Sequence, residues 1–164
     1  MSRRSALFLD RDGVMNRERG RHTWRLEDVE LLPDVAEAVR AGMRHGSRII
    51  VVSNQSGVQL GLYTKADVER VHVYLHDLLA KAGARIDAFF YCPHHPSKGR
   101  CLCRKPGSLL LEKAMARYEI RTEGSVMIGD RERDVQAAEA VGVKGVLVMA
   151  NEPLMPVLRA LGWT

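Results

Sequence analysis

Ten residues near the N-terminus read Ser5-Ala6-Leu7-Phe8-Leu9-Asp10-Arg11-Asp12-Gly13-Val14, an unbroken apolar run that ends in two aspartates. A short apolar run of this kind is typical of a buried strand in a parallel sheet, and open α/β sheets bind ligands where their strands end. If the backbone stays extended through Arg11, Asp10 and Asp12 point the same way, and their like charges favour a divalent hard cation. A solvated Asp-Gly turn explains this stretch equally well.

Length and composition indicate one soluble domain. The chain has 164 residues, of which 46% are hydrophobic and 27% charged, which is ordinary for a globular protein. No apolar run reaches the roughly 20 residues of a membrane helix, and Asp10 interrupts the only N-terminal run that could resemble a signal peptide. We therefore expect one domain over residues 1–164, in the cytoplasm and without membrane contact.

The net charge of +5 favours an anionic partner. With 5% aromatic residues the chain offers few platforms for stacking nucleic-acid bases, and it has no long basic block. A small phosphorylated substrate explains the charge equally well, and we expect that partner and no nucleic acid.

Strand-like and helix-like segments alternate along the chain. Apolar runs predict strands at 7–10, 48–53, 86–91, 125–128 and 145–149. Helical spacing predicts helices from Pro33 to about Gly46 and at 65–81, 108–118, 131–141 and 154–161. Thr64 is a good N-cap for the second helix, and residues 17–32 form a polar loop over the first strand end. This alternation predicts an α/β fold, a Rossmann-like parallel sheet with helices on both faces.

All three cysteines lie between residues 92 and 103. The pairs Cys92-x-His94 and Cys101-x-Cys103 can supply four soft ligands to one tetrahedral ion, for which zinc is the expected occupant. An odd number of cysteines in a cytoplasmic chain argues against disulfides. Four protein ligands leave no open position, so we expect a structural zinc that orders a loop at about 92–107. His95 is the competing ligand.

Polar residues also follow the second and fourth predicted strands. Ser53 and Asn54 can hold phosphate oxygens at the end of the second strand, although a capping role explains them equally well. Asp130 is placed to meet Asp10 and Asp12 as a third hard ligand. Asp134 begins a helix, where the helix dipole alone favours an acid.

Four motifs in this order resemble those of haloacid dehalogenase (HAD) superfamily phosphatases. They are Asp10-x-Asp12-Gly13, Ser53-Asn54, Lys105-Pro106 and Gly129-Asp130-x-x-x-Asp134. The sequences Asp-Arg-Asp-Gly, Asn-Gln-Ser-Gly, Cys-Pro-His-His-Pro and Cys-x-Cys-Arg-Lys-Pro are similar to the zinc-loop subgroup, which contains heptose-bisphosphate and histidinol-phosphate phosphatases. The resemblance implies a HAD-type fold without a large cap domain.

The resemblance also implies roles for the motif residues. Asp10 would be the nucleophile that forms an aspartyl-phosphate, and Asp12 the general acid and base. The Asp10 carboxylate, the Asp12 backbone carbonyl and Asp130 would hold magnesium. Asp134 would orient Lys105 or a metal-bound water. The residues that would bind substrate are Ser53, Asn54, Arg104 and Lys105.

The substrate implied by the resemblance is D-glycero-D-manno-heptose 1,7-bisphosphate, with removal of the 7-phosphate. Histidinol phosphate or another small phosphosugar is the alternative. Two non-catalytic rivals are a receiver-like phosphoacceptor and a zinc-bearing nucleic-acid binder. We expect a monomer. His72 and His76 lie one helical turn apart, with no acid to complete a metal site, and are predicted to lie on a solvated face.

Overall fold

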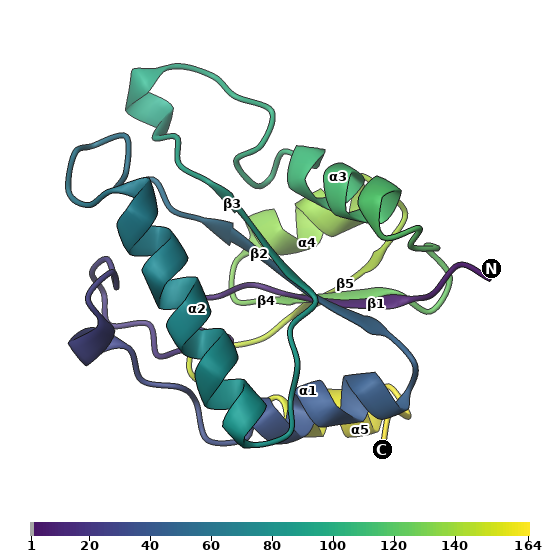
Figure 1. Cartoon of the computed structure of the whole chain (residues 1–164). Coiled ribbons are helices and arrows are strands. Elements are labelled where there is room, and N and C mark those ends of the chain that lie inside the picture. The colour runs from purple at the N-terminus through teal and green to yellow at the C-terminus, as the bar shows by residue number, and fades with distance from the viewer. Residues whose placement is uncertain (1) are drawn as a thin grey trace.

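A computed structural model describes residues 2–164 as one five-stranded sheet with helices on both sides (Figure 1). The strands all run parallel, in the spatial order β3-β2-β1-β4-β5. Their bounds are β1 Ala6–Leu9, β2 Arg48–Asn54, β3 Ala88–Cys92, β4 Val126–Gly129 and β5 Lys144–Leu147. The predicted α/β class is confirmed, and each observed strand lies within two residues of its predicted bounds.

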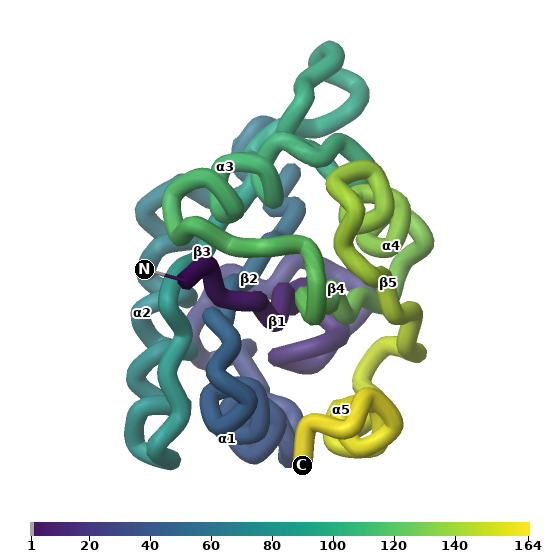
Figure 2. Tube along the Cα trace, turned by 90° about the vertical axis from the view of Figure 1, so that its right-hand side faces the viewer, coloured from purple at the N-terminus to yellow at the C-terminus, as the bar shows by residue number. Residues whose placement is uncertain are grey.

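Helices separate into two layers on either side of the sheet. Their bounds are α1 Val35–Arg44, α2 Lys65–Lys81, α3 Leu109–Arg117, α4 Glu132–Glu139 and α5 Met155–Ala160, with short 3-10 turns at Leu26–Asp28 and Pro96–Lys98. Helices α1 and α5 cover one face and α3 and α4 the other, while α2 runs along the β3 side (Figure 2). Each layer buries its own apolar cluster against the sheet, which accounts for the apolar character of the strands on both faces.

The chain order of the strands reverses beside β1. From β1 the chain proceeds outward through β2 to β3, then returns to the other side of β1 to form β4 and β5. Leu9 of β1 is in register with Val51 of β2 and Ile128 of β4, so the segments after these three strands emerge next to one another. Such a reversal leaves a crevice at the carboxyl ends of the strands, where ligands of open α/β sheets bind.

Local capping explains why α2 has the predicted bounds. Thr64 Oγ1 accepts a hydrogen bond from the Asp67 N–H at 3.1 Å, and Asp67 Oδ2 accepts one from the Thr64 N–H at 2.8 Å. This reciprocal pair satisfies N–H groups that the first turn leaves free. No helix in residues 2–164 has both the length and the apolar character of a membrane span.

The prediction of a solvated face was wrong for His72. Its side chain is 6% exposed and stacks on Phe89 of β3, with ring centroids 4.4 Å apart. His72 lies one turn from Val68 and from Leu75, both of which pack in the core. It therefore belongs to the apolar stripe of α2, whereas the His76 side chain is 43% exposed.

Candidate active site

The segments that follow β1, β2 and β4 meet around a cleft of about 520 Å³. Strand β1 ends at Leu9 and the chain bends at Arg11, yet both Asp10 and Asp12 line this cleft. Asp130, which follows β4, lines it as well. The Asp10 N–H donates to the Ile128 carbonyl at 3.1 Å and so ties the two strand ends together. The three acids therefore line one cleft, but the carboxylate oxygens that lie within 4.8 Å of one another belong to Asp10, Asp130 and Asp134 and not to Asp12.

Lys105 enters the cleft floor from the loop before α3 and is 1% exposed. Its Nζ lies 2.9 Å from Asp10 Oδ1 and 2.7 Å from Asp134 Oδ1, and it donates to the Val52 carbonyl at 2.6 Å. Burial lowers the pKa of Lys105, but the two carboxylates outweigh it and raise that pKa above the ordinary value. The charged ammonium therefore links the two acids.

Asp10 and Asp130 form the part of the site that fits a magnesium ion. One oxygen each of Asp10, Asp130 and Asp134 lie within 4.8 Å of one another, and Asp134 is already paired with Lys105. Burial and the negative charge of Asp10 raise the pKa of Asp130 to about 6. Two buried carboxylates that disfavour each other's charge are a hard-oxygen donor set for a divalent cation.

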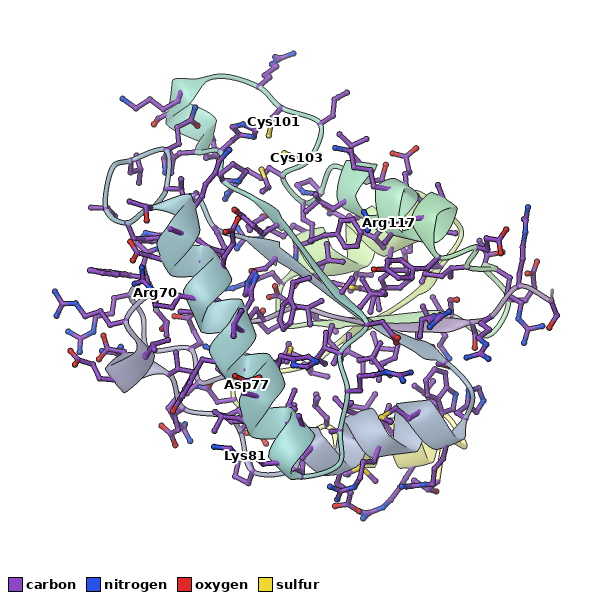
Figure 3. All side chains as sticks on the ribbon, in the orientation of Figure 1. Arg70, Asp77, Lys81, Cys101, Cys103 and Arg117 are labelled. Carbon is purple, nitrogen blue, oxygen red and sulfur yellow. The ribbon has the colours of Figure 1, made fainter. Side chains whose placement is uncertain are left out.

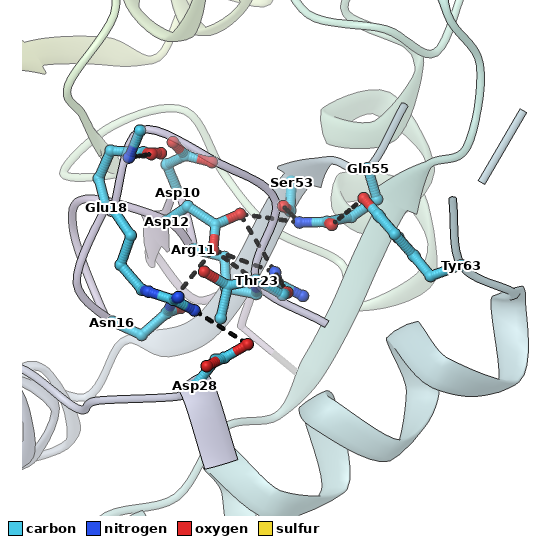
Figure 4. A network of polar contacts seen from close by, with 12 residues as sticks. Asp10, Arg11, Asp12, Asn16, Glu18, Thr23, Asp28, Ser53, Gln55 and Tyr63 are labelled. Carbon is cyan, nitrogen blue, oxygen red and sulfur yellow. Dashed lines mark hydrogen bonds and ion pairs between the residues drawn. The ribbon is translucent and has the colours of Figure 1, made fainter. Parts of the chain in front are cut away.

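Asp12 sits in a different environment from Asp10. Burial raises its pKa, but the Arg11 guanidinium and hydrogen bonds from Asn16 and Gln55 lower the pKa below its ordinary value (Figure 4). Arg11 is completely buried, donates to the Thr23 carbonyl at 2.7 Å and contacts Asp12 Oδ1 at 3.0 Å. The sequence did not point to Arg11 or Gln55 as site residues, because neither side chain is acidic and neither belongs to a metal-ligand pattern.

Asn54 and Ser53 make protein contacts at the end of β2. Asn54 Oδ1 accepts from the Lys105 N–H at 3.0 Å and Nδ2 donates to the Lys105 carbonyl at 3.1 Å, so this side chain holds the Lys105 backbone. Ser53 is 1% exposed and its Oγ accepts from Gln55 at 2.7 Å. Asn54 and Ser56 line the cleft. A phosphate-binding role for Ser53 stays a prediction.

Arginines surround the cleft mouth. Arg104 was predicted from the sequence, and Arg21, Arg131 and Arg133 also line the cleft. Arg104 Nη1 and Arg133 Nε are buried without a hydrogen-bond partner among the described residues. Burial lowers the pKa of the Arg104 guanidinium, and the nearby positive charge of Arg133 lowers it further. Adjacent arginines beside the acids give the cleft an attraction for anions.

The four predicted zinc ligands converge at the end of β3. His94 Nδ1 lies 3.4 Å from Cys92 Sγ and 3.2 Å from Cys103 Sγ, and Cys92 Sγ lies 3.7 Å from Cys101 Sγ. Figure 3 shows the sulfur atoms of Cys101 and Cys103 together in the projecting loop. Cys103 Sγ lies 2.9 Å from Cys92 Sγ, which is closer than the roughly 3.8 Å between sulfur atoms bound to one tetrahedral zinc. The fit to zinc therefore rests on the type of the four donors and on their gathering within 4.8 Å of one another. The His95 ring instead contacts Ser97 Oγ at 2.7 Å.

The parallel sheet, the acids after β1 and β4 and the buried lysine together define a HAD-type phosphatase site. The family model described as HAD-hydrolase-like matches residues 102–152. The chain is 37% identical over 150 residues to D-glycero-beta-D-manno-heptose-1,7-bisphosphate 7-phosphatase of Helicobacter pylori J99, covering 91% of this chain and 85% of that one. The chain therefore belongs to the HAD-like phosphatase family.

Further relatives agree with this assignment. The protein of the same name from Escherichia coli K12 is 36% identical over 159 residues, covering 92% of this chain and 82% of that one. The crystal structure of D,D-heptose 1,7-bisphosphate phosphatase from B. bronchiseptica, complexed with magnesium and phosphate, aligns with a TM-score of 0.83. It is 31% identical and covers 94% of this chain and 86% of its own. Enzymes of this family depend on magnesium.

Proposed function

We propose that this protein removes the 7-phosphate of D-glycero-D-manno-heptose 1,7-bisphosphate and leaves the 1-phosphate in place. The observation that carries the proposal is Asp10, held by Lys105 and facing Asp130, in a cleft edged by arginines. Relatives at 36% and 37% identity that carry this activity in their names support the substrate. A substrate with two phosphates suits a cleft with more than one cationic group.

The proposed reaction proceeds in two displacements on phosphorus. An oxygen of Asp10 bonds to phosphorus while the bond from phosphorus to the sugar oxygen breaks, and Asp12 gives its proton to that departing oxygen. In the second displacement Asp12 takes a proton from a water molecule, whose oxygen bonds to phosphorus. The bond from phosphorus to the Asp10 oxygen breaks, which restores the Asp10 carboxylate and releases inorganic phosphate. The Asp12 carboxylate lines the same cleft as Asp10, as both steps require.

The other residues hold the reactants in this scheme. Asp10, the Asp12 backbone carbonyl and Asp130 would hold magnesium, which supplies positive charge against the transferring phosphoryl group. Lys105 would neutralise the phosphoryl oxygens, and Asp134 would fix Lys105 through their 2.7 Å ion pair. Ser53, Asn54 and Arg104 complete the proposed substrate-binding set.

A structural zinc bound by Cys92, His94, Cys101 and Cys103 would order the loop that carries Arg104. The Arg104 N–H donates to Cys101 Sγ at 3.4 Å, so the cluster and the cleft arginine are adjacent. We expect about one zinc per chain in protein purified without chelators and a large loss in Cys103→Ser, measured by elemental analysis.

The histidine ligand has a matched control. His94→Ala is expected to lose zinc, whereas His95→Ala keeps it because the His95 ring contacts Ser97 Oγ and not the sulfur atoms. Zinc loss in His95→Ala with zinc retained in His94→Ala would contradict the assignment.

Phosphate release from a panel of phosphosugars and histidinol phosphate, with and without magnesium, tests the proposed function. We expect magnesium-dependent turnover that is fastest on heptose 1,7-bisphosphate, and none in Asp10→Asn, whose fold stays intact by circular dichroism. A stable phosphoprotein without turnover would indicate a receiver-like module. Nucleic-acid affinity that falls steeply with salt, again without turnover, would indicate the zinc-bearing binder. The single domain, the monomeric state and the cytoplasmic location stay predictions.

A further inference from the structure

Hydrogen-bond donors hold both oxygens of the Asp12 carboxylate (Figure 4). Oδ1 accepts from Arg11 Nη2 at 3.0 Å and from Asn16 Nδ2 at 2.9 Å. Oδ2 accepts from Gln55 Nε2 at 3.0 Å and from Arg11 Nη2 at 3.2 Å. A general acid works only when its proton lies within hydrogen-bond reach of the departing atom, so small displacements of the carboxyl group are costly. These donors are buried, and they lower the pKa of Asp12, so they serve catalysis by fixing the position of the carboxyl group and not by keeping it protonated.

Arg11 and Asn16 follow β1, as Asp12 does, whereas Gln55 follows β2. Gln55 is 2% exposed and does not line the cleft. Its Nε2 donates to Asp12 and also to Ser53 Oγ at 2.7 Å, while its Oε1 accepts from the Tyr63 hydroxyl at 2.9 Å. If the amide were reversed, its oxygen would face the Asp12 carboxylate and repel it. The Tyr63 hydroxyl therefore reinforces the orientation that Asp12 requires.

Tyr63 is itself fixed by its packing. Its ring stacks on Trp24 at a centroid distance of 6.1 Å and an interplanar angle of 15°. On Gly57 an added Cβ would lie 2.2 Å from Tyr63 Cε1, so the ring rests directly on the glycine backbone. Burial raises the pKa of Tyr63 to about 12, which keeps its hydroxyl protonated as a donor. A rigid path thus runs from the loop around Trp24 to the amide of Gln55.

We infer that Gln55, oriented by Tyr63, is a positioning residue that holds Asp12 for protonation of the departing sugar oxygen. The inference rests on the proposed function, because it takes Asp12 as the general acid. In that step the Asp10 oxygen bonds to phosphorus, the bond from phosphorus to the sugar oxygen breaks, and the Asp12 proton moves to that oxygen. A misplaced Asp12 leaves the sugar to depart as an alkoxide. Nitrophenolate, a far weaker base, departs without a proton.

The leaving group therefore provides the test. We compare kcat/KM on heptose 1,7-bisphosphate and on p-nitrophenyl phosphate, since kcat/KM covers the steps up to alcohol departure and excludes the later attack of water. Gln55→Met keeps the length of the side chain and removes its amide. We expect it to lower kcat/KM by about 10- to 100-fold on the sugar phosphate and by less than about threefold on the nitrophenyl ester.

Tyr63→Phe is a second variant that removes only the hydroxyl, and we expect a smaller loss with the same selectivity, about three- to tenfold on the sugar phosphate. Tyr118→Phe is its matched control: it also loses a hydroxyl, which contacts the Asp87 carbonyl at 3.4 Å, outside the residues that line the cleft. Wild-type kinetics on both substrates are expected for this control. If Gln55→Met fails to fold, Tyr63→Phe alone decides the question.

Equal losses on both substrates, or no loss, in Gln55→Met and Tyr63→Phe overturn the positioning role while leaving the phosphatase proposal intact. Asp12→Asn provides the reference and should show the largest selective loss. If Asp12→Asn loses activity equally on both substrates, the general-acid assignment is wrong and the inference falls with it. A wild-type protein that hydrolyses neither substrate refutes the proposed function itself.

Discussion

Replacing Lys105 with methionine tests the charge balance under the cleft. The Lys105 ammonium is buried within 2.9 Å of Asp10 and 2.7 Å of Asp134, so Lys105→Met leaves two buried carboxylates without their shared cation. Removing one partner of a buried ion pair typically costs about 3–5 kcal/mol, because the remaining charge is uncompensated. We expect a loss of this size in the free energy of unfolding. Turnover should fall about 100-fold or more with the loss of the cation on the phosphoryl oxygens.

A second substitution isolates the electrostatic part of that loss. Asp134→Asn in the Lys105→Met background removes one of the two unpaired charges and should restore about 1–3 kcal/mol of stability, without restoring activity. Lys113→Met, at an exposed position of α3, is the matched control and should stay within about 0.5 kcal/mol of wild type.

Urea unfolding of zinc-loaded protein without added magnesium, followed by far-UV circular dichroism, measures all the variants. A Lys105→Met protein within about 1 kcal/mol of wild type would refute the reasoning. A double variant that is less stable than Lys105→Met would also refute it.

Stability should depend on pH through His72, and turnover should depend on the space beside Gly13. Burial lowers the pKa of His72 to about 3, whereas an unfolded histidine titrates near 6.5, so stability falls as the pH drops below about 6.5, by about 2 kcal/mol at pH 5. Urea unfolding at pH 7.5 and pH 5 should show this loss reduced in His72→Leu and retained in His76→Leu; equal losses would contradict it. Gly13→Ala would put Cβ 2.4 Å from Asp130 Oδ2 and should lower turnover about 100-fold, whereas Gly46→Ala, also at positive φ but with open space around it, should not. The turnover of both glycine variants is measured as a function of magnesium concentration. An equal loss of turnover in Gly13→Ala and Gly46→Ala would exclude the steric explanation.

Features set by neighbouring residues were predictable. The reciprocal cap of Thr64 and Asp67 lies within one turn, and α2 spans Lys65–Lys81 as predicted. The candidate zinc ligands lie within twelve residues, so their spacing alone predicted the convergence of Cys92 and Cys103 that the structure shows. Helical spacing also indicates the burial of His72, because His72 lies one turn from the buried Val68.

Features that depend on packing were not predictable. The amide of Gln55 carries no charge and belongs to no metal-ligand pattern, so only the folded chain shows that it contacts Asp12 and Tyr63. The hydrogen bond that Ser53 Oγ accepts from Gln55 is likewise visible only in the folded chain, and the phosphate-binding role of Ser53 stays a prediction.

By itself the sequence determined the kinds of group available to the site: hard acids at strand ends, a lysine and four soft ligands at or after the end of the third strand, and a parallel α/β sheet. Periodicity and spacing carry that information because each is local. The tertiary structure alone decided that Lys105 lies 2.9 Å from Asp10, a residue 95 positions earlier, and that it is shared with Asp134. Contacts of that precision depend on how the helices and strands pack, which hydrophobic patterning leaves open.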